Sequence, residues 1–305
     1  MKTLRVGVAG AGVFGTYHAQ KAAASVRASL VGVFDMDLAR AQAIAGQYGG
    51  RGFDDYAAML QEVDAVVIAV PATFHEALAA QALDARRHVL VEKPLALHAK
   101  TARALAGKAV TDDLILQVGH QERFVARAMG VLAIDERPLV MESVRAGPPP
   151  DNGRAGDVSV IWDLMIHDLD LAACLIANKF EAVTASGRSV STEHIDEAEA
   201  EFTYVGGAKA RLRASRAADE RERTMRLIYE SGEISVDFLT RKLTNTTPYS
   251  VRVDIAADLP DPLGRADESF FAACLGELDS PVPGYGAIGA VAMAEAAEAA
   301  VLAGD

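Results

Sequence analysis

A lysine follows a buried-strand pattern and precedes a proline in the first third of the chain. Lys93 lies in Glu92-Lys93-Pro94, directly after the apolar run 88–91. Proline cannot continue a central strand, and it biases the residue before it towards an extended conformation. The strand pattern therefore ends at Lys93, and the carboxyl ends of parallel strands form the edge at which open α/β sheets bind ligands. An ammonium group at this edge predicts a role in chemistry rather than in solubility.

A second group of ionisable residues lies near the middle of the chain, in residues 162–171. If this segment is helical, Asp163, His167 and Asp170 share one face at spacings i, i+4 and i+7. A carboxylate one turn from an imidazole fixes the orientation of the ring and raises its basicity. A surface His–Asp pair or a capped helix accounts for the same pattern, so these residues by themselves leave a catalytic and a structural interpretation open.

A glycine pattern near the N-terminus predicts a nucleotide site. Gly10-x-Gly12-x-x-Gly15 closes the first strand pattern and opens a helix, and Asp35 ends the next strand about twenty residues later. The glycines allow a tight turn, close approach of a pyrophosphate to backbone N–H groups, and packing of helix on strand. Asp35 is expected to accept hydrogen bonds from the adenosine ribose.

The acid also predicts which dinucleotide binds. A 2′-phosphate would meet the Asp35 carboxylate, and Met36 beside it offers no compensating cation, so NAD is favoured over NADP. His75 is expected near the nicotinamide end of the cofactor, with a capping or packing role as the alternative. The predicted cofactor-binding residues are Gly10, Gly12, Val13, Phe14, Gly15, Asp35, Met36, Pro71, His75, Glu92 and Lys93.

Several arginines are candidates for binding an anionic group of a substrate. Arg123 carries a guanidinium suited to bidentate phosphate binding, with a helix salt bridge as the alternative. Arg145 and Arg154 flank the proline-rich segment 148–153, which is expected to be an irregular loop, and both are candidates for binding a diphosphate. Six more arginines form a basic group, for which a solvated sheet face paired with glutamates is expected and an interface or phosphate site is the alternative. They are Arg211, Arg213, Arg216, Arg221, Arg223 and Arg226.

The elements that must position these residues fall into two halves. Up to Gly119, continuous apolar strands alternate with amphipathic helices, which predicts an α/β Rossmann domain with a parallel sheet covered on both faces. The expected strands are 4–9, 29–34, 65–70, 88–92 and 114–118, and the expected helices include 73–85 and 98–108. This gives a predicted NAD-binding domain over residues 1–119.

From His120 onwards the strand patterns alternate between apolar and polar residues. Gly206-Gly207 and Ser231-Gly232 are turn signals between such runs, so two hairpins of a mostly antiparallel sheet are expected. This half is predicted to be an α+β domain for substrate binding and oligomerisation over residues 120–305. A sheet of this kind needs a cover, by helices or by another subunit, so a homodimer or homotetramer is expected.

Composition excludes several classes of partner. The net charge of −12 argues against nucleic acid and anionic membranes, which need a positive field. The start of the chain lacks a signal-peptide layout, and the alanine-rich segment 287–303 is interrupted by Glu295 and Glu298, so a packed helix and a cytoplasmic protein are expected. Cys174 and Cys274 have no metal-type spacing, and no metal is predicted.

The ordered set of motifs resembles a known family. The glycine fingerprint with Asp35, then Glu92-Lys93-Pro94, then Asp163-x-x-x-His167 is similar to the Gfo/Idh/MocA family of sugar and cyclitol dehydrogenases. The resemblance implies an N-terminal Rossmann domain and a C-terminal domain with a large open sheet. It also implies that Lys93, Asp163 and His167 are catalytic. Residues 118–124, 145–148 and 163–170 resemble the branch that acts on nucleotide sugars such as UDP-N-acetylglucosamine.

The implied reaction is oxidation of a secondary hydroxyl group of a sugar by hydride transfer to nicotinamide C4. His167 takes the hydroxyl proton and Asp163 orients it, while Lys93 stabilises the alkoxide or takes the proton itself. The residues leave the choice of base between Lys93 and His167 open. A free-sugar, sugar-acid or inositol dehydrogenase is the alternative within the family, and a non-catalytic NAD-binding sensor is the alternative outside enzymes.

Overall fold

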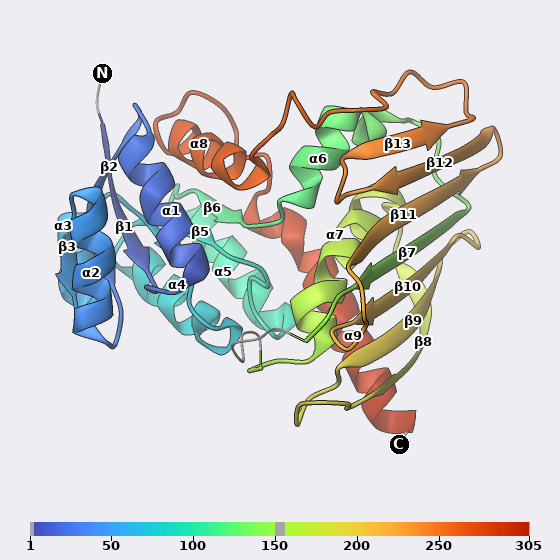
Figure 1. Cartoon of the computed structure of the whole chain (residues 1–305), viewed down its shortest axis with the longest axis horizontal. Coiled ribbons are helices and arrows are strands. Elements are labelled where there is room, and N and C mark those ends of the chain that lie inside the picture. Colours follow the sequence, from blue (N-terminus) through green and yellow to red (C-terminus); the bar gives the residue numbers. More distant parts are fainter. Residues whose placement is uncertain (1–2, 150–155, 305) are drawn as a thin grey trace. The chain divides into compact units, whose positions relative to one another are not determined.

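Residues 3–149 and 156–304 are described by the structure, a computed structural model of the chain. Two compact units emerge from the contacts between Cα atoms. The first comprises Met1–Gly119 and Leu263–Ile288, and the second comprises His120–Pro262 and Gly289–Asp305. Each unit has its own sheet (Figure 1).

The first unit is built on a six-stranded sheet in which every pair of neighbouring strands is parallel. The strand order β3-β2-β1-β4-β5-β6 is that of a Rossmann fold, as predicted. All five predicted strands are present, and the short β3 is an additional one. The bounds are β1 Leu4–Ala9, β2 Ala28–Phe34, β3 Arg51–Phe53, β4 Ala65–Ile68, β5 His88–Val91 and β6 Leu116–Val118.

Helices complete the first unit, and their ends follow local sequence signals. Asp37 and Asp55 cap two of them by accepting hydrogen bonds from backbone N–H groups one turn on. The predicted helix 73–85 is α4 preceded by a 3₁₀ turn, and the predicted helix 98–108 is α5. The bounds are α1 Val13–Ala24, α2 Leu38–Tyr48, α3 Tyr56–Glu62, α4 His75–Asp84, α5 Ala99–Thr111 and α8 Pro262–Cys274, with 3₁₀ turns η1 Ala72–Phe74 and η4 Gly284–Ala287.

The segment Leu263–Ile288 belongs to the first unit although it lies far along the chain. Phe270 and Phe271 of α8 are fully buried in the core cluster that contains Val6 and Val67. A hydrogen bond adds to this packing: the side-chain amide of Gln117 donates to a backbone carbonyl of α8 at 2.9 Å. The predicted second domain ran from 120 to 305, whereas this segment packs on the sheet of the first unit. An amphipathic helix does not reveal from its own pattern which sheet it covers.

The second unit contains a seven-stranded sheet in the order β13-β12-β11-β7-β10-β9-β8, drawn at the right of Figure 1. Only β7 and β10 pair in parallel, so the sheet is mostly antiparallel, as predicted. Both predicted hairpins are present, and Gly206 and Gly207 turn the first with φ of +93° and +86°. The bounds are β7 Val140–Ala146, β8 Phe180–Arg188, β9 Glu197–Tyr204, β10 Lys209–Ser215, β11 Glu222–Tyr229, β12 Gly232–Asp237 and β13 Lys242–Asn245.

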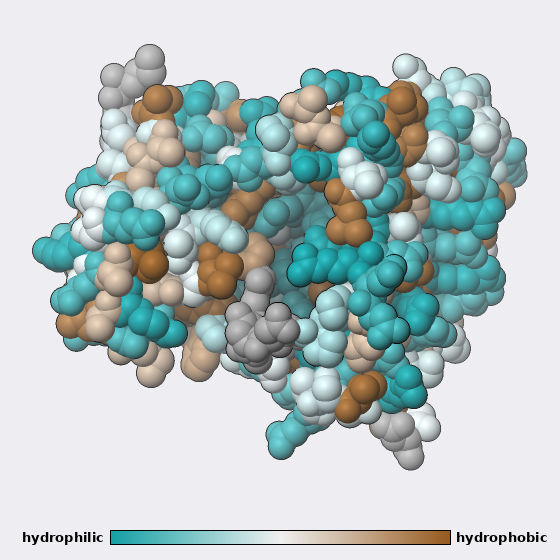
Figure 2. Space-filling view, in the orientation of Figure 1, coloured by the Kyte–Doolittle hydropathy of each residue, from teal (hydrophilic) through white to brown (hydrophobic). Residues whose placement is uncertain are grey.

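One face of this sheet is covered by helices, and no helix in the described part of the chain covers the other face. The covered face carries the buried members of each alternating strand, such as Phe202 and Leu212, and α7 packs on β7 and β10. Where the sheet reaches the surface at the right of Figure 2, hydrophilic residues predominate. The helical elements are α6 Glu122–Met129, the 3₁₀ turn η2 Val131–Ala133, the π-helical turn η3 Ile161–Met165, α7 Ile166–Leu175 and α9 Ile288–Gly304.

The C-terminal helix is the packed helix that the sequence predicts. In the described part of the chain, the stretch Gly284–Gly304 is long and apolar enough to cross a membrane by length and composition. Core helices pass the same test, and α9 is anchored in the second unit. Glu298 accepts a hydrogen bond from the indole of Trp162 at 2.6 Å, and Met293 lies 3.5 Å from the Tyr204 hydroxyl.

Candidate active site

The glycine turn between β1 and α1 fits a dinucleotide. Gly10 has a φ of +104°, and a Cβ at Gly15 would lie 1.7 Å from the carbonyl oxygen of Gly10, so both positions require glycine. A Cβ at Gly12 would meet no atom within 4 Å, which leaves open space beside the helix start. The first N–H groups of a helix have no partner inside the helix, and they bind anions. Open space beside these donors suits a pyrophosphate.

Asp35 stands at the end of β2 in the position expected for ribose recognition. Its carboxylate accepts the Ala11 N–H at 2.8 Å and the Asp37 N–H at 2.9 Å. The Arg40 guanidinium also donates to it at 2.8 Å. Burial of Asp35 favours the neutral acid, but these donors outweigh it, so the pKa of the carboxyl group is lowered. An anionic acceptor is therefore held ready at this end of the sheet.

The neighbours of Asp35 differ in part from the prediction. Met36 is 87% exposed, and it offers no charge, as predicted. However, Arg40, in the first turn of α2, supplies a cation at Asp35 that bears on the preference for NAD over NADP. Met36 is the neighbour of Asp35 in sequence, whereas the start of α2 brings Arg40 back to Asp35 in space. The carboxylate itself, which would repel a 2′-phosphate, remains in place.

Glu92 and Lys93 directly follow β5, and Glu92 belongs to a buried group of charges. Glu92 is 7% exposed, and its carboxylate lies 3.3 Å from Nε2 of His18. Nδ1 of His18 lies 2.9 Å from the carboxylate of Asp267 in α8, and neither side chain of that pair is exposed. Burial opposes ionisation of Glu92, but His18 and then Lys93 lower its pKa. The residue before Lys93 is thus tied to α1 and α8.

The two carboxylates and the imidazole form a buried triad of Glu92, His18 and Asp267. Burial by itself would lower the pKa of His18, but Asp267 and then Glu92 raise it to about 10. His18 is therefore an imidazolium between two carboxylates. Gly119 makes room for the triad, because a Cβ there would lie 2.6 Å from Oε1 of Glu92. Sequence reasoning missed His18 and Asp267, which are 249 residues apart.

His75 has a packing role in the structure, the alternative that the sequence left open. The ring is 2% exposed, with Nδ1 2.7 Å from the Pro94 carbonyl and Nε2 2.9 Å from the Val70 carbonyl. Burial lowers its pKa against the effect of these carbonyls. His75 ties the turn after Lys93 to the end of β4. Pro71, predicted with it, is exposed at the same sheet edge, and Lys93 is half-buried.

In the second unit, His167 lies beside a carboxylate that the sequence did not single out. Nδ1 of His167, at the start of α7, is 2.8 Å from Oε2 of Glu122 in α6. Arg145 of β7 donates to the other oxygen of Glu122 at 2.8 Å and to Asp168 at 3.1 Å. Burial opposes ionisation of Glu122, but His167 and Arg145 lower its pKa well below its ordinary value. A carboxylate in this position orients the imidazole and raises its basicity.

Asp163 lies in a π-helical turn rather than in a regular α-helix. Residues Ile161–Met165 form this turn, and α7 starts at Ile166. A π-turn inserts an extra residue per turn, so the predicted shared face of Asp163, His167 and Asp170 is broken at this point. Single π-turns are frequent at functional sites, because they redirect side chains within an otherwise regular helix. Asp163 and His167 are both half-buried, whereas Asp170 is 1% exposed.

Two of the predicted phosphate ligands have their guanidinium groups engaged elsewhere. Arg123 donates to Asp170 at 2.6 and 2.5 Å, and it is 6% exposed. Arg145 is 1% exposed and is held by Asp168 and Glu122. Both arginines therefore brace α6, α7 and β7. For Arg123 this is the salt bridge that the sequence left open as the alternative, and for Arg145 it differs from the predicted contact with a diphosphate. The third predicted ligand, Arg154, lies outside the described residues.

The basic group of the sequence separates into three kinds of residue. Arg211, Arg213 and Arg226 lie on the uncovered sheet face and pair with glutamates, as expected. Arg216 is buried and donates to Asp196 at 2.6 Å, which the expectation of a solvated face did not foresee. Arg221 is exposed, and Arg223 is half-buried. In the described residues, no group of three or more His, Cys, Asp or Glu side chains is arranged to hold a metal.

Comparison with known proteins covers both units. The model described as "Oxidoreductase family, NAD-binding Rossmann fold" matches residues 4–120, and "GFO/IDH/MocA C-terminal domain" matches residues 140–235. UDP-N-acetylglucosamine 3-dehydrogenase from Acidithiobacillus ferrooxidans is 40% identical over 242 residues, 79% of this chain and 76% of that protein. The solved structure of that organism's GnnA matches with a TM-score of 0.89 and 35% identity, covering 99% of both chains.

A second relative has a different substrate in its name. Inositol 2-dehydrogenase from Rhizobium meliloti is 35% identical over 208 residues, 64% of this chain and 62% of that protein. The two family models follow one another along the chain and correspond to the Rossmann sheet and to the mostly antiparallel sheet. The glycine turn, the acid at the end of β2 and the two matched models lead to one conclusion: the chain belongs to the Gfo/Idh/MocA family of NAD-binding oxidoreductases.

Proposed function

We propose that the protein oxidises a secondary hydroxyl group of a nucleotide sugar of the UDP-N-acetylglucosamine type. The observation that carries this proposal is the contact of His167 with the ionised Glu122, in a chain 40% identical to a UDP-N-acetylglucosamine 3-dehydrogenase. A buried carboxylate on an imidazole is the arrangement of a general base. NAD, when bound, accepts the hydride from the carbon that carries the hydroxyl group.

In the second unit, we propose that His167 accepts the proton of the substrate hydroxyl group. Glu122 lies against Nδ1 of the ring, so Nε2 is the nitrogen that takes the proton. The charge of Glu122 stabilises the imidazolium that forms. Asp163, four residues earlier and in the π-turn, remains our second candidate for orienting His167 or a substrate hydroxyl. Arg145 keeps Glu122 ionised and fixed, because it bridges Glu122 and Asp168.

In the first unit, we assign electrostatic stabilisation to Lys93. Its ammonium stands at the carboxyl edge of the parallel sheet, where a ligand of a Rossmann domain binds. The neighbouring Glu92 is fixed by the buried triad, and Pro94 is fixed by His75. As an ammonium, Lys93 would lower the energy of the alkoxide; as a neutral amine, it would instead accept the proton of the substrate hydroxyl group. We propose that Gly10, Gly12, Val13, Phe14, Gly15 and Asp35 hold NAD, with Met36, Pro71 and Glu92 beside them.

The substrate is tested by following nicotinamide absorbance with purified protein and NAD. We expect absorbance to rise with UDP-N-acetylglucosamine and to stay flat with free N-acetylglucosamine, free glucose and myo-inositol. A rise with myo-inositol only would favour the second candidate function, inositol dehydrogenation, which the 35% identity to inositol 2-dehydrogenase supports. No rise with any sugar, in protein shown to bind NAD, would contradict the proposed enzyme and favour a sensor.

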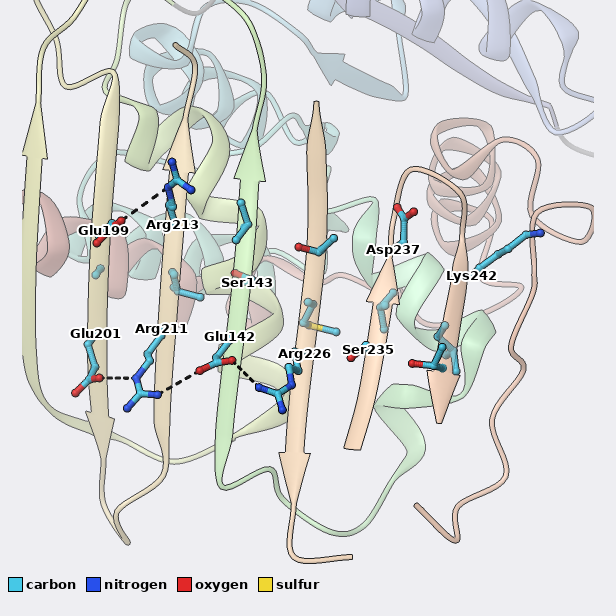
Figure 3. Close-up of a pocket in the computed structure, with 18 of the residues that line it drawn as sticks. Glu142, Ser143, Glu199, Glu201, Arg211, Arg213, Arg226, Ser235, Asp237 and Lys242 are labelled. Carbon is cyan, nitrogen blue, oxygen red and sulfur yellow. Dashed lines mark hydrogen bonds and ion pairs between the residues drawn. The ribbon is translucent and has the colours of Figure 1, made fainter. Parts of the chain in front are cut away.

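We also propose that the uncovered sheet face binds a second copy of this chain. Figure 3 shows a row of opposite charges across this face, in which Glu201, Arg211, Glu142 and Arg226 alternate. The face is an open groove of about 1390 Å³ lined by β7–β13. A row of alternating charges is complementary to itself after a twofold rotation, and an open sheet face usually needs a cover.

A cytoplasmic location and the absence of nucleic-acid partners stay predictions of the sequence.

Light scattering after size-exclusion chromatography tests this interface. We expect the mass of a dimer or tetramer for the wild-type protein and a smaller mass for the double variant R211E/R226E, because like charges would then face one another along the row. The Arg103→Glu variant, at an exposed position of α5 in the first unit, serves as a control and should keep the wild-type mass. A monomeric wild-type protein at micromolar concentration would refute the interface.

A further inference from the structure

Arg223 stands at the start of β11 on the covered face of the second sheet. In the register of β11 with β7, Arg223 is directly opposite Arg145. Directly opposite residues of antiparallel strands project to the same face. Arg145 is buried under α7 on the covered face, and Met225, Leu227 and Tyr229 continue the same alternation along β11. Arg223 therefore extends towards the helices and away from the glutamates of the uncovered face.

Among the described residues, Arg223 has no hydrogen bond or ion pair for its guanidinium. The two carboxylates that attract Arg223 are already engaged: Asp168 holds Arg145, and Glu122 is shared by Arg145 and His167. Burial and the repulsion of Arg145 lower the pKa of Arg223, and the attraction of Glu122 and Asp168 does not compensate. A half-buried cation that lacks a carboxylate is costly unless a ligand completes it.

The position of Arg223 links it to the proposed chemistry. Its charge helps to lower the pKa of Glu122, so it lies within electrostatic reach of the carboxylate that contacts His167. Asp168, which holds Arg145, also attracts Arg223, and Arg221, just before β11, is an exposed second cation. The Arg223 guanidinium offers paired N–H donors within electrostatic reach of Glu122, and paired donors match two oxygens of a phosphate group.

We propose that Arg223 binds a phosphate oxygen of the substrate's diphosphate and thereby selects nucleotide sugars over free sugars. The inference rests on the proposed function, because it concerns the substrate of the same site. Arg223 takes the anion-binding role that was predicted for Arg123 and Arg145. The guanidinium groups of those two arginines are engaged by Asp170, Asp168 and Glu122. Neutral sugars have no group that needs this cation, so the effect of Arg223 is confined to ligands that carry a phosphate.

The test compares binding of UDP, uridine and UDP-N-acetylglucosamine by titration calorimetry in the presence of NADH. We expect Arg223→Gln to weaken binding of UDP and UDP-N-acetylglucosamine by about 10- to 100-fold, the loss typical of a charge-assisted hydrogen bond. Uridine should bind both proteins equally, and Arg223→Lys should recover part of the loss, because it restores the charge without the paired donors. Arg188→Gln, an exposed arginine of β8, is the matched control and should bind UDP as the wild type does. Unchanged NADH binding shows that Arg223→Gln is folded.

The outcomes separate this inference from the proposed function. If the wild type oxidises UDP-N-acetylglucosamine and Arg223→Gln binds UDP as tightly as the wild type, the role of Arg223 is refuted while the proposed function stands. If the wild type instead binds a sugar acid such as glucuronate and Arg223→Gln loses that binding, the phosphate assignment is overturned in favour of a carboxylate. If the wild type binds none of these ligands, the proposed function fails first.

Discussion

Lys93→Ala and His167→Ala proteins are expected to turn over substrate about 100- to 10,000-fold more slowly than the wild type while they still bind NAD. Each change removes a group proposed to act on the hydroxyl proton or on the charge that replaces it. Neither change alters the glycine turn or Asp35, the residues that we propose to hold NAD. The measurement is the steady-state rate of NAD reduction, with NADH binding followed by fluorescence in parallel.

The control for this experiment is Lys100→Ala, which removes an exposed lysine from α5, close to Lys93 in sequence. It should keep the wild-type rate. Rates near the wild type in both the Lys93 and His167 variants would remove the catalytic assignment altogether. A large loss in only one of them would identify the base between the two residues, which the sequence left open. The Asp163→Asn and Glu122→Gln variants then show which carboxylate serves His167.

A second large effect is expected on stability. His18→Gln is expected to lower the free energy of unfolding by about 3–5 kcal/mol, because it removes the imidazolium that lies between the buried carboxylates of Glu92 and Asp267. Urea denaturation at pH 7 measures this loss. Gln20→Ala, an exposed residue of the same helix, should change the value by less than about 0.5 kcal/mol. A loss below about 1 kcal/mol for His18→Gln would mean that the triad is not charged.

The triad also predicts how stability depends on pH. The pKa of His18 is raised from its ordinary 6.5 to about 10 in the folded protein. The stabilisation is therefore complete below pH 6.5, declines above it, and is lost as the pH rises through about 10. At about 1.4 kcal/mol per pKa unit, the contribution is on the order of 4–5 kcal/mol. The wild type should lose stability across this window, whereas His18→Gln should show a flatter profile; equal slopes would contradict the assignment.

Several functional features were accessible from the sequence because they depend on neighbours along the chain. The tight turn at Gly10 and the packing at Gly15 need only a strand, a turn and a helix in succession, and that order is visible in the alternation of residue types. The hairpin at Gly206-Gly207 is equally local. Family resemblance added the catalytic interpretation of Lys93 and His167, which spacing by itself did not distinguish from a structural one.

The partners of the charged residues were not accessible in this way. Arg123 and Arg145 looked like phosphate ligands because their side chains suit phosphate, but the fold places Asp170 and Asp168 against them first. Arg40 reaches Asp35 only because α2 turns back over the end of β2. A charge in a sequence carries no information about which opposite charge will be buried beside it.

The sequence by itself therefore determined the strands of the parallel sheet, the nucleotide turn and the two hairpins, since each rests on a periodicity or a spacing of a few residues. It also determined the family, since that rests on short motifs in a fixed order along the chain. Only the tertiary structure decided that α8 packs on the first sheet, that Glu122 contacts His167, and that His18 lies between Glu92 and Asp267. The side-chain contacts among these join residues that are between 45 and 249 positions apart in the sequence. Such pairs form when whole faces of helices and sheets are buried together, and the free energy of that burial is shared among many residues rather than carried by any local motif.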